Sequence, residues 1–147
     1  MSQQQQDFKT FMKERQHVAA AYVNGDAEPL GQMVARQSPA TFMSPGGGVV
    51  RGTQEVWSRY QKDAGRFEPG SATEIEVLDM AAGDSVAYWT GIQHAQARMK
   101  GQPGFVANKL RVTEVFKREG DAWKLVHRHA DPLTAEAGAG GPRGGGH

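Results

Sequence analysis

The chain has 147 residues, with 17 Lys or Arg against 16 Asp or Glu, a formal net charge of +1 and no cysteine. This length suits one domain with a real core, and the charge balance gives no electrostatic reason to expect nucleic acid or an acidic membrane as a partner. Without cysteine, disulfides, thiolate metal sites and a cysteine nucleophile are excluded.

Helical spacing of apolar residues predicts a first helix over residues 8–23, capped by Asp7 and ended by the NGD sequence at 24–26. A second short helix carries Pro29 in its first turn and stops before Pro39. Short strands at 40–43 and 49–51 are predicted to form a hairpin, and Thr53 is expected to cap a third helix that ends near Gly65 or Phe67.

Alternating patterns then predict strands over residues 71–80, 85–98, 109–118 and 123–130, separated by turns such as EGD at 119–121. No strand–helix alternation is present, so a parallel sheet is not expected. The fold class predicted is α+β, with a curved antiparallel sheet packed against three N-terminal helices.

The two ends of the chain differ from this pattern. The polar residues 1–6 and the glycine-rich residues 134–147 are expected to be disordered, which leaves one domain over residues 7–133. The N-terminus lacks the apolar segment of a signal peptide, and no apolar stretch is long enough to cross a membrane. A soluble protein in the cytoplasm is therefore the expectation.

In order and spacing, this sequence resembles the nuclear transport factor 2-like superfamily, which includes ketosteroid isomerase, SnoaL-type cyclases and the calcium/calmodulin-dependent kinase II association domain. The residues that carry the resemblance are NGD at 24–26, ATFMSP at 40–45, VRG at 50–52, VAY at 86–88, TEVFKR at 113–118 and WKLVHRH at 123–129. The last of these is most similar to the kinase association domain. The resemblance implies a cone-shaped fold and a homodimer formed through the outer face of the sheet.

The catalytic residues of ketosteroid isomerase do not carry over. The position of its general base is Ser44, the position of its oxyanion-hole tyrosine falls near Val18, and that of its oxyanion-hole aspartate falls near Thr113. The classical isomerase mechanism is therefore not expected. The association domain has an arginine after its second histidine, and Ala130 stands there in this chain.

The last strand supplies the candidate catalytic residues. Leu125, His127, His129 and Asp131 alternate along it and should point the same way. The resemblance places this set inward. His127 and His129 could then act as general acid or base, with Asp131 orienting one ring. Buried histidines bonded to backbone or water are the alternative.

A metal site is a second alternative, because His127 and His129 with His94 or Asp131 would offer nitrogen and oxygen ligands. The related families are mostly metal-free, so no metal and no cofactor are expected. Arg111 shares a strand face with Thr113 and could hold an anionic group, or could pair with a glutamate across the sheet.

The remaining candidates are aromatic or lie on the long strand over 85–98. The full set of expected ligand-binding residues is Tyr22, Trp57, Tyr60, Tyr88, His94, Arg111 and Thr113. The aromatic members could equally be core residues. Trp89 and Phe116 are expected to face outward into a dimer interface.

Two functions remain open from the sequence. One is a small-molecule binding protein or enzyme, with acid–base chemistry of the isomerase, cyclase or hydrolase type on an apolar or carbonyl-containing ligand. The other is a non-catalytic association module whose pocket is vestigial or regulatory.

Overall fold

The computed structural model describes residues 2–134. Within this range the chain forms, in order, α1 (Gln3–Val23), α2 (Glu28–Met33), β1 (Thr41–Met43), β2 (Val49–Arg51), α3 (Thr53–Ala64), β3 (Phe67–Ala82), β4 (Val86–Met99), β5 (Val106–Glu119) and β6 (Ala122–Pro132). The predicted tail over 134–147 falls almost wholly outside the described residues. None of the helices described is both long and apolar enough to cross a membrane.

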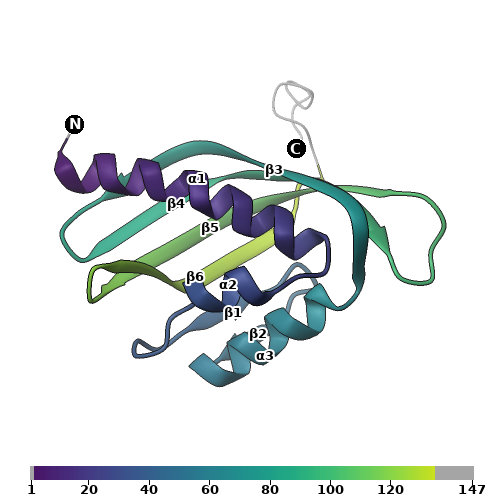
Figure 1. Ribbon diagram of the computed structural model, residues 1–147, viewed down its shortest axis with the longest axis horizontal. Coiled ribbons are helices and arrows are strands. Elements are labelled where there is room, and N and C mark those ends of the chain that lie inside the picture. The colour runs from purple at the N-terminus through teal and green to yellow at the C-terminus, as the bar shows by residue number, and fades with distance from the viewer. Residues whose placement is uncertain (1, 135–147) are drawn as a thin grey trace.

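The strands form one bent sheet in the order β2-β1-β6-β5-β4-β3, with α1 lying across one face and α2 and α3 at the end that holds the short strands (Figure 1). The predicted α+β class is confirmed. The expectation of a wholly antiparallel sheet is wrong at one place, because β1 pairs with β6 in parallel. The short hairpin thus attaches beside the last strand of the chain.

The first helix begins earlier than its sequence predicts. Ser2 is the N-cap, and its side chain and that of Gln5 complete a capping box, so Asp7 is not the cap. The helix therefore starts within residues 1–6, which the sequence predicts to be disordered. Its buried face carries Phe8 and Val18 as expected, together with one charged residue, Arg15.

Two polar side chains of α1 fix it to the edge strand β3. The Gln16 side chain donates to the carbonyl of Thr73 and accepts from the backbone N–H of Ile75, both at 2.8 Å. Asn24, at the end of the helix, makes the equivalent pair of bonds with the backbone of Ser71 at 2.9 and 3.1 Å. These bonds satisfy groups that an edge strand leaves unpaired, and they set the position of the helix over the sheet.

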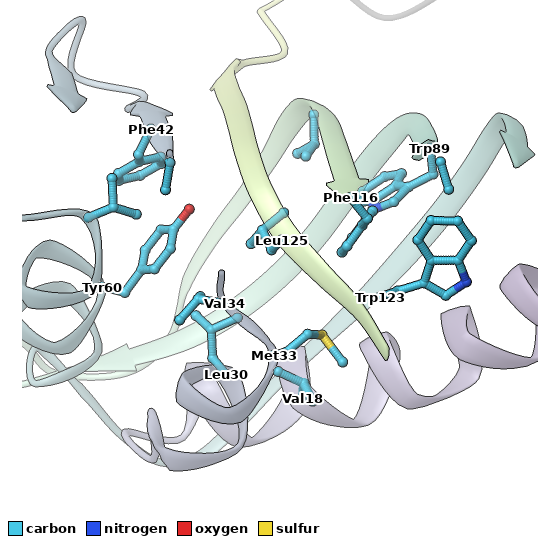
Figure 2. Packing of buried hydrophobic residues seen from close by; sticks show 14 of the residues in the cluster. Val18, Leu30, Met33, Val34, Phe42, Tyr60, Trp89, Phe116, Trp123 and Leu125 are labelled. Carbon is cyan, nitrogen blue, oxygen red and sulfur yellow. The ribbon is translucent and has the colours of Figure 1, made fainter. Parts of the chain in front are cut away.

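Aromatic rings fill the core between α1 and the sheet. Trp89 and Phe116 are each 0% exposed, and Phe8 contacts Phe116 edge-on with ring centroids 5.5 Å apart. In Figure 2 the rings of Trp89, Phe116 and Trp123 lie on one side of Leu125. The expectation that Trp89 and Phe116 face outward into a dimer interface is therefore wrong, because both point into the core.

A β-bulge in β6 changes which residues face the core. Phe116 pairs with Leu125 and Val115 pairs with His127, so Val126 has no partner on β5. The extra residue reverses the alternation of the strand from that point onward. Leu125 faces inward as expected, but the inward residues after it are Arg128 and Ala130.

Candidate functional site

A pocket of about 430 Å³, partly open to solvent, lies between α1, α3 and the inner face of the sheet. Side chains from both helices and from β1, β3, β4, β5 and β6 line it. Its apolar wall includes Ala19, Leu30, Phe42, Phe67, Leu110 and Leu125. This volume and this mainly apolar lining with a few polar groups are typical of a small-molecule site.

The polar part of the cavity is built on a buried ion pair between α1 and β5. Arg15 donates from Nε to Oε1 of Glu114 and from one terminal nitrogen to Oε2, both at 2.9 Å. The two side chains are 5% and 0% exposed. This two-point contact fixes the plane of the guanidinium and leaves its other terminal nitrogen, NH1, directed away from the carboxylate.

Two more donors complete the shell of Glu114. The indole N–H of Trp89 donates to Oε1 at 2.7 Å, and Arg128 donates from NH1 to Oε2 at 2.7 Å. Arg128 also donates from its other terminal nitrogen to the amide oxygen of Gln93 at 2.8 Å. Each carboxylate oxygen therefore accepts two hydrogen bonds.

This arrangement fixes the charges. Burial by itself would raise the pKa of Glu114, but the Arg15 and Arg128 guanidiniums outweigh it and hold the pKa at about 2. Burial also disfavours the charged form of Arg15, yet Glu114 raises the pKa of that arginine above its usual value. Glu114 is thus a permanent carboxylate with no capacity left to accept a proton at neutral pH.

Two buried donors beside the cavity have no hydrogen-bond partner among the described residues. They are NH1 of Arg15 and the hydroxyl of Tyr60, and both side chains line the cavity. Burial raises the pKa of Tyr60 and that of Tyr22, so both phenols stay protonated. In Figure 2 the Tyr60 hydroxyl points away from α3, which carries it, beside the ring of Phe42.

Asp63 on α3 is the only carboxylate among the described residues that line the cavity, and no histidine is among them. Arg59, one helical turn earlier, donates from Nε to both oxygens of Asp63 at 3.0 and 3.1 Å. The carbon of the same guanidinium lies 5.6 Å from the centroid of the Phe42 ring. Unlike Glu114, Asp63 keeps lone pairs that could accept a proton.

The structure brings together only part of the site that the sequence predicts. Tyr22 and Tyr60 line the cavity. Trp57 lies outside the lining. Its ring occupies the space that a Cβ on Gly31 would need. The guanidinium carbon of Arg36 lies 5.9 Å from the centroid of the same ring. Trp57 therefore packs α3 against α2.

The histidines of β6 do not reach the cavity. Because of the bulge, His127 and His129 lie on the outer face of the sheet, and the expectation that they point inward with Leu125 is wrong. Nδ1 of His127 lies 2.7 Å from the Thr41 hydroxyl on β1. Burial, followed by the neighbouring His129, lowers the pKa of His127.

The other expected residues share that outer face. Arg111 donates to Asp131 at 2.6 Å, as an ion pair on neighbouring strands. The hydroxyl of Thr113 lies 2.8 Å from that of Thr90. His94 lies 2.8 Å from Glu76, and the Tyr88 hydroxyl donates to Asp79. These side chains form a polar band on the outer face of the sheet, and their part in any reaction stays a prediction.

A metal site finds no support in this arrangement. Over residues 2–134, no three His, Asp or Glu side chains converge closely enough to hold an ion. His129 approaches Asp131 to 3.5 Å, but Arg111 already occupies the carboxylate of that residue.

Sequence reasoning missed Arg15, Glu114, Arg128 and Asp63. A signal existed for the first two. Arg15 falls on the apolar stripe of α1, and Glu114 alternates in phase with Phe116, so each is a charge on a face otherwise built for the core. Arg128 carried no such signal, because only the bulge turns it inward.

The positions that correspond to the ketosteroid isomerase machinery do not form a site here. Ser44 is buried in the turn after β1, where its N–H donates to Gly48, and Val18 belongs to the core. Thr113 faces outward, and the next residue, Glu114, takes the inward position. None of these is among the described residues that line the cavity.

Comparison with known families and structures agrees with this fold. A family model described as a SnoaL-like domain matches residues 15–134. Comparison with curated proteins finds no significant match.

Among solved structures, a candidate dehydratase of the NTF2-like family from Streptomyces avermitilis has a TM-score of 0.71 at 23% identity, covering 88% of this chain and 98% of that one. An NTF2-like superfamily protein from Salmonella enterica also scores 0.71, at 15% identity, with 90% and 94% covered. The kinase II hub from S. rosetta scores 0.63 at 17% identity, with 90% and 98% covered. At these identities the similarity establishes the nuclear transport factor 2-like fold.

Proposed function

Because this chain belongs to the SnoaL-like domain family, we propose that it binds a small molecule in the cavity between α1, α3 and the sheet. The ligand presents an acceptor oxygen, such as that of a carbonyl group, to the Tyr60 hydroxyl and to NH1 of Arg15. Its apolar body lies against the wall that contains Phe42 and Leu125.

The two unpartnered donors carry this proposal. A buried polar group without a hydrogen bond costs about 1–3 kcal/mol, so a folded protein rarely keeps such a group without a use. Arg15 and Tyr60 come from different helices, yet both line one cavity. A ligand oxygen would satisfy them, and its binding would recover part of that cost.

The same geometry supports acid–base chemistry next to a carbonyl. With the oxygen held by Tyr60 and Arg15, negative charge that develops on it as an enolate would be stabilised. Asp63 would take the proton from the neighbouring carbon and return it to the ligand, as in an isomerase or cyclase reaction. Glu114 is unsuited to this role because four donors already occupy its oxygens.

The test of binding compares Tyr60→Phe with Tyr88→Phe, its matched control on the outer face. Thermal shift and calorimetry with a panel of apolar ketones, including 4-phenyl-2-butanone, should show binding to the wild type and to Tyr88→Phe, and weaker binding to Tyr60→Phe. The wild-type protein should also release a bound small molecule on denaturation, detected by mass spectrometry. A protein that binds no member of the panel and releases nothing would overturn the proposal.

The proton-transfer step has its own test. Exchange of the α-protons of a bound ketone for deuterium, followed by NMR, should depend on Asp63 and fall strongly in Asp63→Asn. Unchanged exchange in that variant would remove Asp63 from the reaction.

A second candidate function is association through the outer face of the sheet. Met43 and Val86 are 36% and 46% exposed there, on the face of the sheet opposite to the one that α1 covers. A second copy that packs its own outer face against this one would bury them symmetrically. Sedimentation measures the oligomeric state of the wild type and of Val86→Lys. A dimer through this face should be weakened in the variant, because the lysine would be buried in the interface.

A further inference from the structure

The loop that joins β4 to β5, residues 100–105, extends beyond the end of the sheet (Figure 1). Its first residue is held to the start of β3, because the backbone N–H of Lys100 donates to the carbonyl oxygen of Arg66 at 2.9 Å. Its last residue, Phe105, is 55% exposed. The loop therefore presents a large apolar side chain to solvent at an outer point of the molecule.

Three cations surround this aromatic ring. They are Arg66, Arg98 and Lys100, and the first and last of them are exposed. The guanidinium carbon of Arg98 lies 5.3 Å from the centroid of the Phe105 ring. Glu68 lies opposite Arg98 in the register of β3 with β4 and offsets part of the charge. Within residues 2–134, none of the three cations forms an ion pair with a carboxylate.

The same end of the molecule holds an opening of the cavity. Arg66 is exposed and yet lines the cavity, and Met99, the last residue of β4, lines it too. The nearest carboxylate of the lining, Asp63, is already engaged by Arg59. The loop and its cations therefore lie beside an opening through which an apolar ligand can enter.

An exposed ring among cations is the pattern of a segment that binds at a lipid–water interface. Each Lys or Arg near an anionic bilayer is worth about 1 kcal/mol, and an apolar side chain adds the free energy of entering the acyl boundary. The net charge of +1 does not reveal this cluster, because it averages over the whole chain. A rigid acidic protein fits less well, since a narrow protruding loop would bury little area against it.

We propose that the loop over residues 100–105 docks this protein on an anionic phospholipid surface. Phe105 enters the interface, and Arg66, Arg98 and Lys100 contact the phosphates of the headgroups. The opening of the cavity is then turned toward the membrane. This inference goes beyond the proposed function and stands without it, because docking needs no ligand in the cavity.

The test is co-sedimentation of the ligand-free protein with lipid vesicles. One set is phosphatidylcholine alone, and the other is phosphatidylcholine mixed with phosphatidylglycerol. We expect at least about tenfold tighter binding to the mixed vesicles at low salt, and a smaller preference at high salt. Equal or absent binding to the two sets at low salt would overturn the inference, whatever the ketone panel shows.

Two pairs of variants locate the contact. Phe105→Ser should weaken binding to the mixed vesicles, whereas Leu78→Ser, at a 64% exposed position on β3, should not. Lys100→Glu should weaken it about tenfold, whereas Lys13→Glu, the same change at an exposed position on α1, should leave it nearly unchanged. Equal losses in the two charge variants would contradict the inference, because overall charge would then explain the binding.

A soluble polyanion distinguishes a lipid surface from an acidic protein. Calorimetry with poly-glutamate at the same salt concentration should show weaker binding than the mixed vesicles do, because the polymer offers charge without an apolar interface. Binding of poly-glutamate that depends on Lys100, without binding to the vesicles, would assign the loop to an acidic protein and overturn the lipid inference. Circular dichroism checks that each variant is folded.

Discussion

The indole N–H of Trp89 donates to Oε1 of Glu114 at 2.7 Å, although both side chains are completely buried. The aromatic core and the polar end of the cavity therefore meet at one hydrogen bond. Trp89→Phe keeps an aromatic ring but removes this donor, and it should lower the free energy of unfolding by about 1–3 kcal/mol. Urea denaturation measures the change, with Trp57→Phe as the control that touches no buried charge.

Acid should weaken the fold through Glu114. Its folded-state pKa of about 2 lies below the ordinary value of 4.5, so the stability it contributes is present above pH 4.5 and is lost as pH falls toward 2. Glu114→Gln lacks this contribution. The difference in unfolding free energy between wild type and Glu114→Gln should therefore shrink as pH falls from 5 to 2. A constant difference over this range would show that other carboxylates, such as Glu119, carry the acid sensitivity.

Tyr60→Phe should have opposite effects on stability and on binding. Without ligand, the variant loses a buried hydroxyl that has no partner, so its thermal midpoint should equal or exceed that of the wild type. Ligand affinity should fall in the same variant. A clear loss of stability without ligand would mean that the hydroxyl already has a partner in solution.

Replacing both outer-face histidines tests whether the bulge reverses the alternation of side chains along β6. His127→Ala with His129→Ala should leave binding in the cavity unchanged, because the bulge at Val126 turns both away from it. Arg128→Gln, between them in sequence, should change it. Calorimetry with 4-phenyl-2-butanone compares the two proteins. Loss of binding in the double histidine variant would contradict the register of β6.

Gly91 should tolerate no side chain. A Cβ there would lie 2.0 Å from the carbonyl oxygen of Glu76, on the neighbouring strand β3. Since backbone atoms cannot move aside cheaply, Gly91→Ala should shift the strands apart and lower the thermal midpoint strongly. Gly83→Ala is the control, because its nearest neighbour would be 3.8 Å away. Similar midpoints for the two variants would argue against the close pairing of β3 and β4.

The sequence predicted the fold far better than the site, and β6 shows why. Apolar periodicity and turn residues locate helices and strands, so the order of elements and the α+β class follow from local pattern. The direction of a side chain on a strand depends on register, which one unpaired residue reverses. Nothing local distinguishes Val126 as that residue. The sequence pattern therefore placed His127 and His129 on the inner face, where the structure has Arg128.

Long-range pairing limited the prediction in a second way. Arg15 and Glu114 are 99 positions apart, and each alone is an ordinary charged residue. Only the crossing of α1 over β5 makes them a buried pair. A charge on an apolar stripe was a usable clue at both positions, whereas the helical neighbours Arg59 and Asp63 also fit a solvated helix face.

The parallel pairing of β1 with β6 also has a consequence for how the chain is made. β6 follows the other five described strands in the chain, yet it occupies the third place in the sheet, between β1 of the early hairpin and β5. Until it emerges, the hairpin has no neighbour in the sheet, and Arg128 is not yet present to join the cavity wall. The edge of β1 that later pairs with β6 therefore stays unpaired while β3, β4 and β5 are made. The binding site is completed only when β6, which follows the other described strands in the chain, has been translated.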